Sequence, residues 1–331
     1  MSKNILITGI TGFVGSHLAD FLIEHKIDCN IHGLKRWHLS NLKNIKSIIN
    51  HIQLHDCDIT DPISVRKLME KLKPDIIFHC AAESFVSPSW DHPHRYMNVN
   101  YNGTLNFLDS IHNLKLKTIF HIPGSGEEYG DIHENEIPIT PETVLRPVNP
   151  YAVSKIAQDL IGYVYNRSYK LNVIRTRAFN HEGPRREKVF GIAWYAFQIA
   201  MIEKGLMNPL MKVGEIDDRR NFTHVKDMVE AYWLSTQKCV PGELYLVGTE
   251  DENSIFTFRE ALEKLIEMSK VKNIKYKTVA EFVRPTGVPR LIADTQKFRK
   301  ATNWQPKKTF QDILNDTLEY WRDRVNRGDY I

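Results

Sequence analysis

A tyrosine and a lysine four residues apart, Tyr151 and Lys155, form the first candidate catalytic pair. Four residues is about one helical turn, so both side chains would project from one face of a helix, and Pro150 suits the start of that helix. A tyrosine hydroxyl titrates near pH 10 and is a poor base at neutral pH, but an ammonium group beside it stabilises the phenolate. The pair could therefore take a proton from an alcohol that is being oxidised.

Two further polar residues lie after an apolar run that is typical of a strand. Ser125 would hydrogen-bond the same reacting oxygen as Tyr151, and Glu127 follows two residues later. Glu128 is expected to point the other way if strand geometry continues. The alternatives are structural: a surface helix pair for Tyr151 and Lys155, and a cap or loop contact for Glu127.

A glycine-rich segment near the start of the chain predicts a dinucleotide site. The run Ile5-Leu6-Ile7-Thr8-Gly9-Ile10-Thr11-Gly12-Phe13-Val14-Gly15 matches the end of a strand, a turn and the start of a helix. The glycines permit the turn, the approach of a pyrophosphate and close helix–strand packing, and the helix N-terminus attracts phosphate. A purely structural glycine turn is the alternative. The predicted contacts come from Gly9, Thr11, Gly12, Phe13, Val14 and Gly15.

The end of the second expected strand distinguishes NAD from NADP. An acidic residue there would hydrogen-bond the ribose 2′-hydroxyl, but this segment carries Lys35 and Arg36 and no carboxylate. Arg36, with Lys35 beside it, is expected to pair with a 2′-phosphate. NADP is therefore the predicted cofactor, and a solvated surface pair is the alternative.

Residues after the third and fourth expected strands complete the predicted cofactor site. Asp58 and Ile59 follow the third strand and could contact the adenine edge. Ala81, Ala82 and Ser84 follow the fourth, where small side chains let the backbone pass close to the cofactor.

The elements that must position these residues alternate between strand and helix in the first half of the chain. Strand-length runs rich in Ile and Val indicate parallel strands buried on both faces. The α/β alternation predicts a doubly wound parallel sheet, the Rossmann fold. The expected strands are Asn4–Thr8, Cys29–Gly33, Ile52–Leu54, Ile76–Cys80, Thr118–Ile122 and Val173–Arg177, and the expected helices include Val14–Glu24, Ser64–Leu72 and Gly103–Asn113.

The alternation weakens after about Asn180, which predicts a second, smaller α/β lobe. We expect residues 1–180 to bind NADP and carry the Ser/Tyr/Lys centre, and residues 181–331 mainly to bind the substrate, with the chain free to cross between lobes. Strands at Met211–Gly214 and Glu243–Val247 and helices at Val225–Gln237, Thr257–Ser269 and Thr309–Asn326 are expected in this second half.

Bulk composition narrows the functional class further. The 331 residues include 44 basic and 40 acidic side chains, and the net charge of +4 is too small to argue for nucleic-acid binding. No apolar run approaches the roughly 20 residues that span a bilayer, and no signal peptide is recognisable. The four cysteines and the histidines around Pro93 match no metal pattern. A cytoplasmic protein without a metal, a nucleic-acid partner or a membrane anchor is expected.

Over essentially its whole length the chain resembles the extended short-chain dehydrogenase/reductase family. Within that family it is most similar to the GDP-mannose 4,6-dehydratases and the GDP-4-keto-6-deoxy-mannose reductases. The resemblance implies that Asn180 and Arg220 contact the substrate diphosphate and that Arg186 and Arg284 line the nucleotide pocket, with Ser84, Ser125 and Glu127 near the sugar. A structural salt bridge is the alternative for each arginine. The matching segments are the glycine turn, Asp58-Ile59, Ala81–Ser84, Asn98–Asn100 with Gly103-Thr104, Ser125, Tyr151 and Lys155, Phe179–Arg186, Arg219–Asp227 and Arg284–Pro289.

Two positions depart from the dehydratase pattern. Gly126 replaces the polar middle residue of Thr-Ser-Glu, and Gly287 replaces the glutamate of Arg-Pro-Thr-Glu, whose side chain contacts the nucleotide ribose in the family. These departures leave the sugar open: GDP-mannose is the expected type, and GDP-N-acetylglucosamine or a GDP-heptose is an alternative.

Three activities are compatible with the resemblance. A 4,6-dehydratase oxidises C4 of the hexose, eliminates water across C5 and C6 and returns the hydride to C6; it needs a carboxylate such as Glu127, and the Asn180–Arg186 run favours this reading. A reductase or an epimerase is the alternative. A non-catalytic NADP-binding regulator is remote, because Tyr151 and Lys155 are both retained. Helices at Gly103–Asn113 and Tyr151–Asn166 would pair in a homodimer or homotetramer, and packing within one copy's core is the alternative for their apolar faces.

Overall fold

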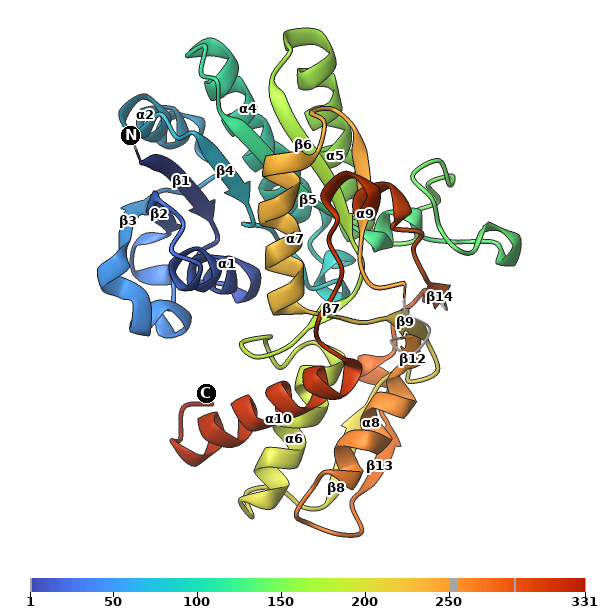
Figure 1. Ribbon diagram of the computed structural model, residues 1–331. Coiled ribbons are helices and arrows are strands. Elements are labelled where there is room, and N and C mark those ends of the chain that lie inside the picture. Colours follow the sequence, from blue (N-terminus) through green and yellow to red (C-terminus); the bar gives the residue numbers. More distant parts are fainter. Residues whose placement is uncertain (1, 251–254, 289, 331) are drawn as a thin grey trace.

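The first lobe is built on one parallel sheet. The computed structural model describes residues 2–250, 255–288 and 290–330, and Figure 1 shows a larger lobe above a smaller one. The large sheet has seven strands in the order β11-β6-β5-β4-β1-β2-β3, all parallel. The strands are β1 (Lys3–Thr8), β2 (Cys29–Lys35), β3 (Ile52–Asp56), β4 (Ile76–His79), β5 (Ile119–Ser125), β6 (Asn172–Ala178) and β11 (Leu244–Val247).

Helices cover both faces of this sheet, as the doubly wound fold requires. One face packs against α1 and α7 through a core that includes Ile5, Leu18 and Met228. The other face packs against α2, α4 and α5 through a core that includes Met69 and Phe107. The helices of this lobe are α1 (Phe13–Glu24), α2 (Pro62–Leu72), α3 (Pro93–Tyr96), α4 (Gly103–Asn113), α5 (Pro150–Tyr169), α7 (Val225–Lys238) and α9 (Gln296–Thr302).

The second lobe packs three helices and short strands around its own core. Side chains of α6 (Gly191–Glu203), α8 (Phe258–Glu267) and α10 (Phe310–Asn326) form that core. The short strands pair as β8 with β13, β7 with β10, and β9 with β12 and β14. Their bounds are β7 (His181–Glu182), β8 (Leu210–Val213), β9 (Arg219–Asn221), β10 (Thr223–His224), β12 (Ile255–Thr257), β13 (Lys275–Thr278) and β14 (Arg290–Leu291).

The chain crosses between the lobes after residue 180. Strand β11 pairs with β6 in the large sheet, and α7 packs beside α1 on the face of that sheet. The residues that follow β6 therefore contribute to both lobes, because the chain returns to the first lobe with α7 and β11 after it has entered the second.

The predicted fold class is confirmed, and each of the six strands expected in the first half is present. Five of them are longer than expected, among them β2, which continues to Lys35, and β5, which continues to Ser125. Both extensions bring predicted site residues to the carboxyl edge of the sheet. Within the described ranges, no helix is long and apolar enough to cross a membrane.

Candidate active site

A cavity of about 420 Å³ opens at the carboxyl ends of the strands of the large sheet. Parallel α/β sheets bind their ligands at this edge. Of the residues predicted to act in catalysis or binding, all but Arg220 line this cavity. Residues from both halves of the chain, from Gly9 to Leu291, form its wall.

The glycine turn between β1 and α1 forms one end of the cavity. Gly9 has a φ of +67°, and a Cβ on Gly15 would lie 2.4 Å from the carbonyl oxygen of Gly9. A Cβ on Gly9 would meet the backbone nitrogen of Ala81 at 2.9 Å. Helix α1 begins after Gly12 without a side-chain cap, so its first N–H groups remain available to a phosphate. The turn therefore fits a pyrophosphate.

The two cations at the end of β2 differ in their surroundings. Lys35 forms an ion pair with Asp56, the residue directly opposite it on β3. Arg36 lines the cavity, and its backbone N–H donates to the Ser40 hydroxyl at 2.8 Å. The carboxylate of Asp58 accepts from the backbone and hydroxyl of Thr60, at 2.9 and 2.8 Å. Arg36 is thus better placed than Lys35 to bind an added anion.

Asn100 holds the loop after β4 and was missed as a site residue by the sequence analysis, although its segment was part of the resemblance. Its amide accepts from the N–H of Glu83 at 2.9 Å and donates to the carbonyl of Glu83 at 3.0 Å. The same amide donates to Ser154 on α5 at 2.9 Å. Asn100 lies in a π-helical turn, Met97–Asn102, a distortion that is frequent at functional sites. It fixes the Ala81–Ser84 loop against the helix that carries Tyr151.

Helix α5 presents Tyr151 and Lys155 to the cavity. Its first turn is capped by Asn149, whose side chain accepts the Ala152 N–H at 2.8 Å. The ammonium of Lys155 donates to the carbonyl of Pro123 at 2.7 Å and also bonds Gln158. The pair predicted from the four-residue spacing is therefore brought into one buried site.

Burial shifts the pKa values of both members of the pair. Burial raises the pKa of Tyr151, and its hydrogen bond with Ser125 opposes that rise. Burial lowers the pKa of Lys155 to about 8, while Glu128 and Asp159 raise it. When protonated, Lys155 places a positive charge in the same cavity as Tyr151, and a nearby positive charge favours the phenolate form of a tyrosine.

The side chains of Glu127 and Glu128 point in different directions, as expected. The cause is a turn that follows β5, not a continuation of the strand. A 3₁₀ turn, Gly126–Tyr129, starts at Ser125, whose hydroxyl accepts the Glu127 N–H at 3.2 Å. Glu127 lines the cavity, 3.3 Å from the amide nitrogen of Asn149 and 3.7 Å from a guanidinium nitrogen of Arg284. Glu128 is fully buried behind the turn. The carboxylate available to a substrate is therefore that of Glu127.

The polar residues expected to bind substrate divide into two groups. Asn180, Arg186 and Arg284 line the cavity together with Ser84. Arg220 is 2% exposed and donates to the Asp218 carboxylate at 3.1 Å, so the structure does not bring it to the cavity wall. The Asp218 carboxylate accepts a hydrogen bond from the Arg220 guanidinium, which was expected to bind a substrate phosphate.

Arg186 lies in the cavity wall with aromatic rings as its main neighbours. Its guanidinium stacks on Phe190 at 3.6 Å and lies 4.9 Å from the ring of Phe13. The nearest carboxylate is that of Glu182, at 3.8 Å, and burial raises the pKa of Glu182 to about 7. Within the described part of the chain the Nε of Arg186 has no hydrogen-bond partner. Such a cation is suited to an anionic ligand.

Fold and site together define an extended short-chain dehydrogenase/reductase. Residues 6–317 match the family model described as GDP-mannose 4,6 dehydratase. A GDP-mannose 4,6 dehydratase of Drosophila melanogaster is 31% identical over 96% of this chain and 85% of the relative. A GDP-6-deoxy-D-mannose reductase of Pseudomonas aeruginosa is 30% identical over 98% of this chain and 99% of the relative.

A solved structure agrees with these sequence relatives. The Pseudomonas aeruginosa protein RMD, solved in complex with NADPH, superimposes with a TM-score of 0.82 at 28% identity, over 98% of this chain and 100% of that one. The chain belongs to the GDP-mannose 4,6-dehydratase family. Pro289, the last residue of the resembling segment Arg284–Pro289, lies outside the described residues.

Proposed function

We propose that the protein is an NADP-dependent GDP-sugar 4,6-dehydratase, with GDP-mannose as the first substrate to test. The observation that carries this proposal is the Glu127 carboxylate, which lines the same cavity as Ser125, Tyr151 and Lys155. Oxidation at C4 needs only the last three groups, whereas elimination across C5 and C6 also needs a base and an acid. GDP-N-acetylglucosamine and a GDP-heptose remain in the substrate panel because of Gly126 and Gly287.

Each protein group in this mechanism has a defined task. Tyr151, as phenolate beside Lys155, takes the proton of the C4 hydroxyl, and Ser125 hydrogen-bonds the same oxygen. NADP supplies the hydride acceptor for C4 and the hydride donor for C6. Glu127 removes the C5 proton, made acidic by the C4 ketone, and delivers a proton to the departing C6 hydroxyl, which leaves as water. The hydride returns to C6, C5 takes a proton from the solvent, and Tyr151 releases to the solvent the proton it took from the C4 hydroxyl, which completes the 4-keto-6-deoxy sugar and restores the protein groups.

The binding roles follow from the cavity wall. The glycine turn, Arg36, Asp58, Ile59 and the Ala81–Ser84 loop hold the cofactor, because added Cβ atoms would fill the cradle at Gly9 and Gly15. On the substrate side, Asn180, Arg186 and Arg284 bind the nucleotide diphosphate. Arg220 reaches it only if its pairing with Asp218 is exchanged for a phosphate. The second lobe provides most of the nucleotide-sugar site.

Arg36 is expected to select NADP over NAD through the 2′-phosphate. Loss of a charge-assisted hydrogen bond costs roughly 1.5–3 kcal/mol, so Arg36→Ala should weaken NADP binding about tenfold or more and leave NAD binding nearly unchanged. Titration of the intrinsic fluorescence with each cofactor measures both. Lys35→Ala is the matched control, with a smaller effect because Asp56 already pairs with Lys35. An equal loss for NAD and NADP in Arg36→Ala contradicts the assignment.

We also propose that two copies pair through the outer face of α5. Val153, Leu160 and Val164 recur at helical spacing and are 45–47% exposed, which is unusual for a monomer surface when such residues cluster. A two-fold axis would pack this face against itself, and two such dimers could form a tetramer.

Light scattering should show an oligomer for the wild type and a monomer for the double variant Leu160→Glu with Val164→Glu. Val240→Glu, at an exposed apolar residue elsewhere, should change nothing; a monomeric wild type rejects the proposal.

The proposed location is the cytoplasm. All four cysteines, Cys29, Cys57, Cys80 and Cys239, are free thiols, which suits a reducing compartment.

A reductase acting on a 4-keto-6-deoxy sugar is the second candidate. One observation favours it: the chain matches 99% of the Pseudomonas reductase but 85% of the Drosophila dehydratase. Incubation with GDP-, UDP- and dTDP-sugars decides between the two. Loss of 18 mass units without net cofactor consumption supports the dehydratase, while stoichiometric oxidation of NADPH by a 4-keto sugar supports the reductase.

A further inference from the structure

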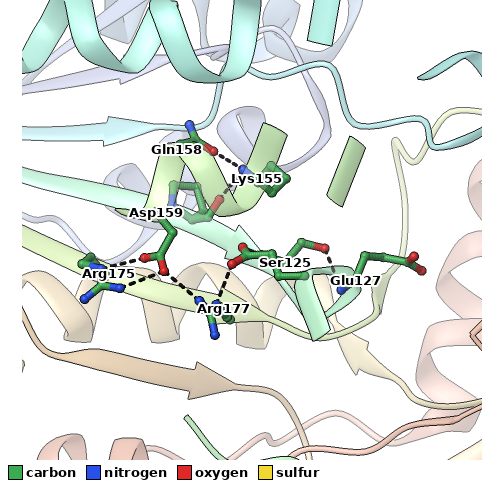
Figure 2. Close-up of polar contacts among 9 residues, drawn as sticks. Ser125, Glu127, Lys155, Gln158, Asp159, Arg175 and Arg177 are labelled. Carbon is green, nitrogen blue, oxygen red and sulfur yellow. Dashed lines mark hydrogen bonds and ion pairs between the residues drawn. The ribbon is translucent and has the colours of Figure 1, made fainter. Parts of the chain in front are cut away.

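A chain of buried charges lies behind the catalytic residues (Figure 2). Arg175 donates two hydrogen bonds to Asp159, at 2.6 and 2.8 Å, and Arg177 donates to Asp159 at 2.8 Å. Arg177 then donates to Glu128 at 2.6 Å. All four side chains are at most 8% exposed, and their formal charges sum to zero. None of the four lines the cavity.

At one end of this row of buried charges, Glu128 contacts the backbone of the catalytic residue Ser125. One oxygen of Glu128 accepts from Arg177, and the other accepts the N–H of Ser125 at 2.7 Å. Space for this carboxylate depends on Gly124, where a Cβ would lie 2.6 Å from the Glu128 oxygen. Burial raises the pKa of Glu128, while the adjacent Arg177 guanidinium and the Ser125 N–H favour its ionised form. Glu128 is thus held at both ends.

At the other end of the row of buried charges, Asp159 belongs to helix α5, which carries Tyr151 and Lys155. Asp159 lies on α5, four residues beyond Lys155 and eight beyond Tyr151. Arg177 lies on β6 between them. The buried charges therefore connect the turn that carries Ser125 and Glu127 to the helix that carries Tyr151 and Lys155. Groups that act on one substrate from separate elements must keep their relative positions, since a displacement of about 1 Å can cost roughly 100-fold in rate.

Stability alone does not account for this arrangement. A buried ion pair can often be replaced by apolar residues with no loss of stability, so burial of four charges is not by itself a gain. The feature that needs a reason is the contact between Glu128 and the backbone of Ser125. That contact orients the hydroxyl that shares a hydrogen bond with Tyr151 and starts the turn that directs Glu127 into the cavity.

We propose that Glu128 is a positioning residue for catalysis: bridged between Arg177 and the Ser125 N–H, it fixes Ser125 and Glu127 relative to Tyr151. The proposal rests on the proposed function, because it assigns Ser125 and Glu127 to the same reaction. Glu128 itself touches no substrate; it acts through the turn it holds.

Glu128→Gln, in the full-length protein with NADP added, tests the proposal. Glutamine keeps the shape, but its amide nitrogen is a donor and would face either Arg177 or the Ser125 N–H, which are donors too. One of the two hydrogen bonds is therefore lost. We expect amide exchange in residues 123–130 to rise roughly tenfold or more and kcat to fall roughly 10–100-fold with KM little changed. Glu136→Gln is the matched control: Glu136 also caps a 3₁₀ turn and pairs with an arginine, Arg146, outside the cavity. It should alter neither kcat nor exchange in residues 123–130.

A double variant separates positioning from a structural role. Glu128→Met with Arg177→Met removes both charges and leaves the Arg175–Asp159 pair intact. Thermal stability should return toward the wild type, but kcat should stay low because nothing holds the Ser125 N–H; recovery of kcat overturns the proposal. Unchanged exchange in residues 123–130 of Glu128→Gln also overturns it. If the wild type converts no nucleotide sugar, the proposed function fails, and the exchange comparison still decides whether Glu128 holds the turn.

Discussion

Tyr151→Phe is expected to lose C4 oxidation almost completely while the cavity stays intact. The phenylalanine ring keeps the edge contact with Tyr96, whose ring centroid lies 6.2 Å away, so the helix should fold as before. What disappears is the hydroxyl that takes the substrate proton. A positioned proton-transfer group contributes about 10²–10⁴-fold, and kcat should fall by that factor with KM nearly constant.

Single-turnover absorbance of the reduced nicotinamide measures this loss directly, since the mutant should form no reduced cofactor from a bound GDP-sugar. Tyr96→Phe is the matched control: Tyr96 is equally buried, donates its hydroxyl to the carbonyl of Phe85 and does not line the cavity. It should cost about 1 kcal/mol of stability and little activity. Turnover by Tyr151→Phe at the wild-type rate contradicts its catalytic role, whereas absence of turnover by the wild type would favour the non-catalytic regulator.

The parts of the site that could be predicted from the sequence depend on local spacing. Tyr151 and Lys155 are four apart on one helix, and the glycine turn lies within seven residues between β1 and α1. Ser125 was predictable because it ends a strand of the parallel sheet, and the carboxyl ends of such strands gather at one edge. These inferences need no knowledge of distant partners.

The features that sequence reasoning missed depend on contacts between distant segments. Lys35 is neutralised by Asp56 because the two lie opposite each other in the β2–β3 register, and a register cannot be read from one strand. Arg220 is buried and donates to Asp218, two residues before it, and this local pairing is not visible from the residue types alone. The Glu128–Arg177 pair joins residues 49 positions apart, and neither position stands out in the sequence.

Helix α6 was missed for a different reason. Gly191–Glu203 is apolar on nearly every face and buried all round, so it lacks the polar stripe that identifies an amphipathic helix. The second lobe also uses strands of two to four residues, too short for a period-two pattern to emerge. The elements of the second lobe were therefore harder to predict than the alternating βα units of the first.

Glu127→Gln should separate oxidation from elimination, and it has the largest consequence for the proposed function. Glutamine retains the shape and an oxygen that can accept from Asn149, now 3.3 Å from the glutamate, but it cannot remove a proton. The loss should be at least about 100-fold in the rate of dehydration. Because Tyr151, Lys155 and Ser125 are untouched, C4 oxidation should continue, and absorbance of the reduced nicotinamide should appear and persist.

Incorporation of deuterium from the solvent distinguishes a dehydratase from a reductase. In deuterated water the wild type should place deuterium at C5 and accumulate no reduced cofactor, since the hydride taken from C4 is returned to C6, while Glu127→Gln should show no exchange at C5. Glu127→Asp keeps the charge but shortens the side chain by one methylene and should retain part of the exchange. A reductase would behave differently, because it removes no C5 proton and Glu127→Gln would cost it little. Dehydration by Glu127→Gln at the wild-type rate would show that another group is the base, and the dehydratase assignment would lose the observation that carries it.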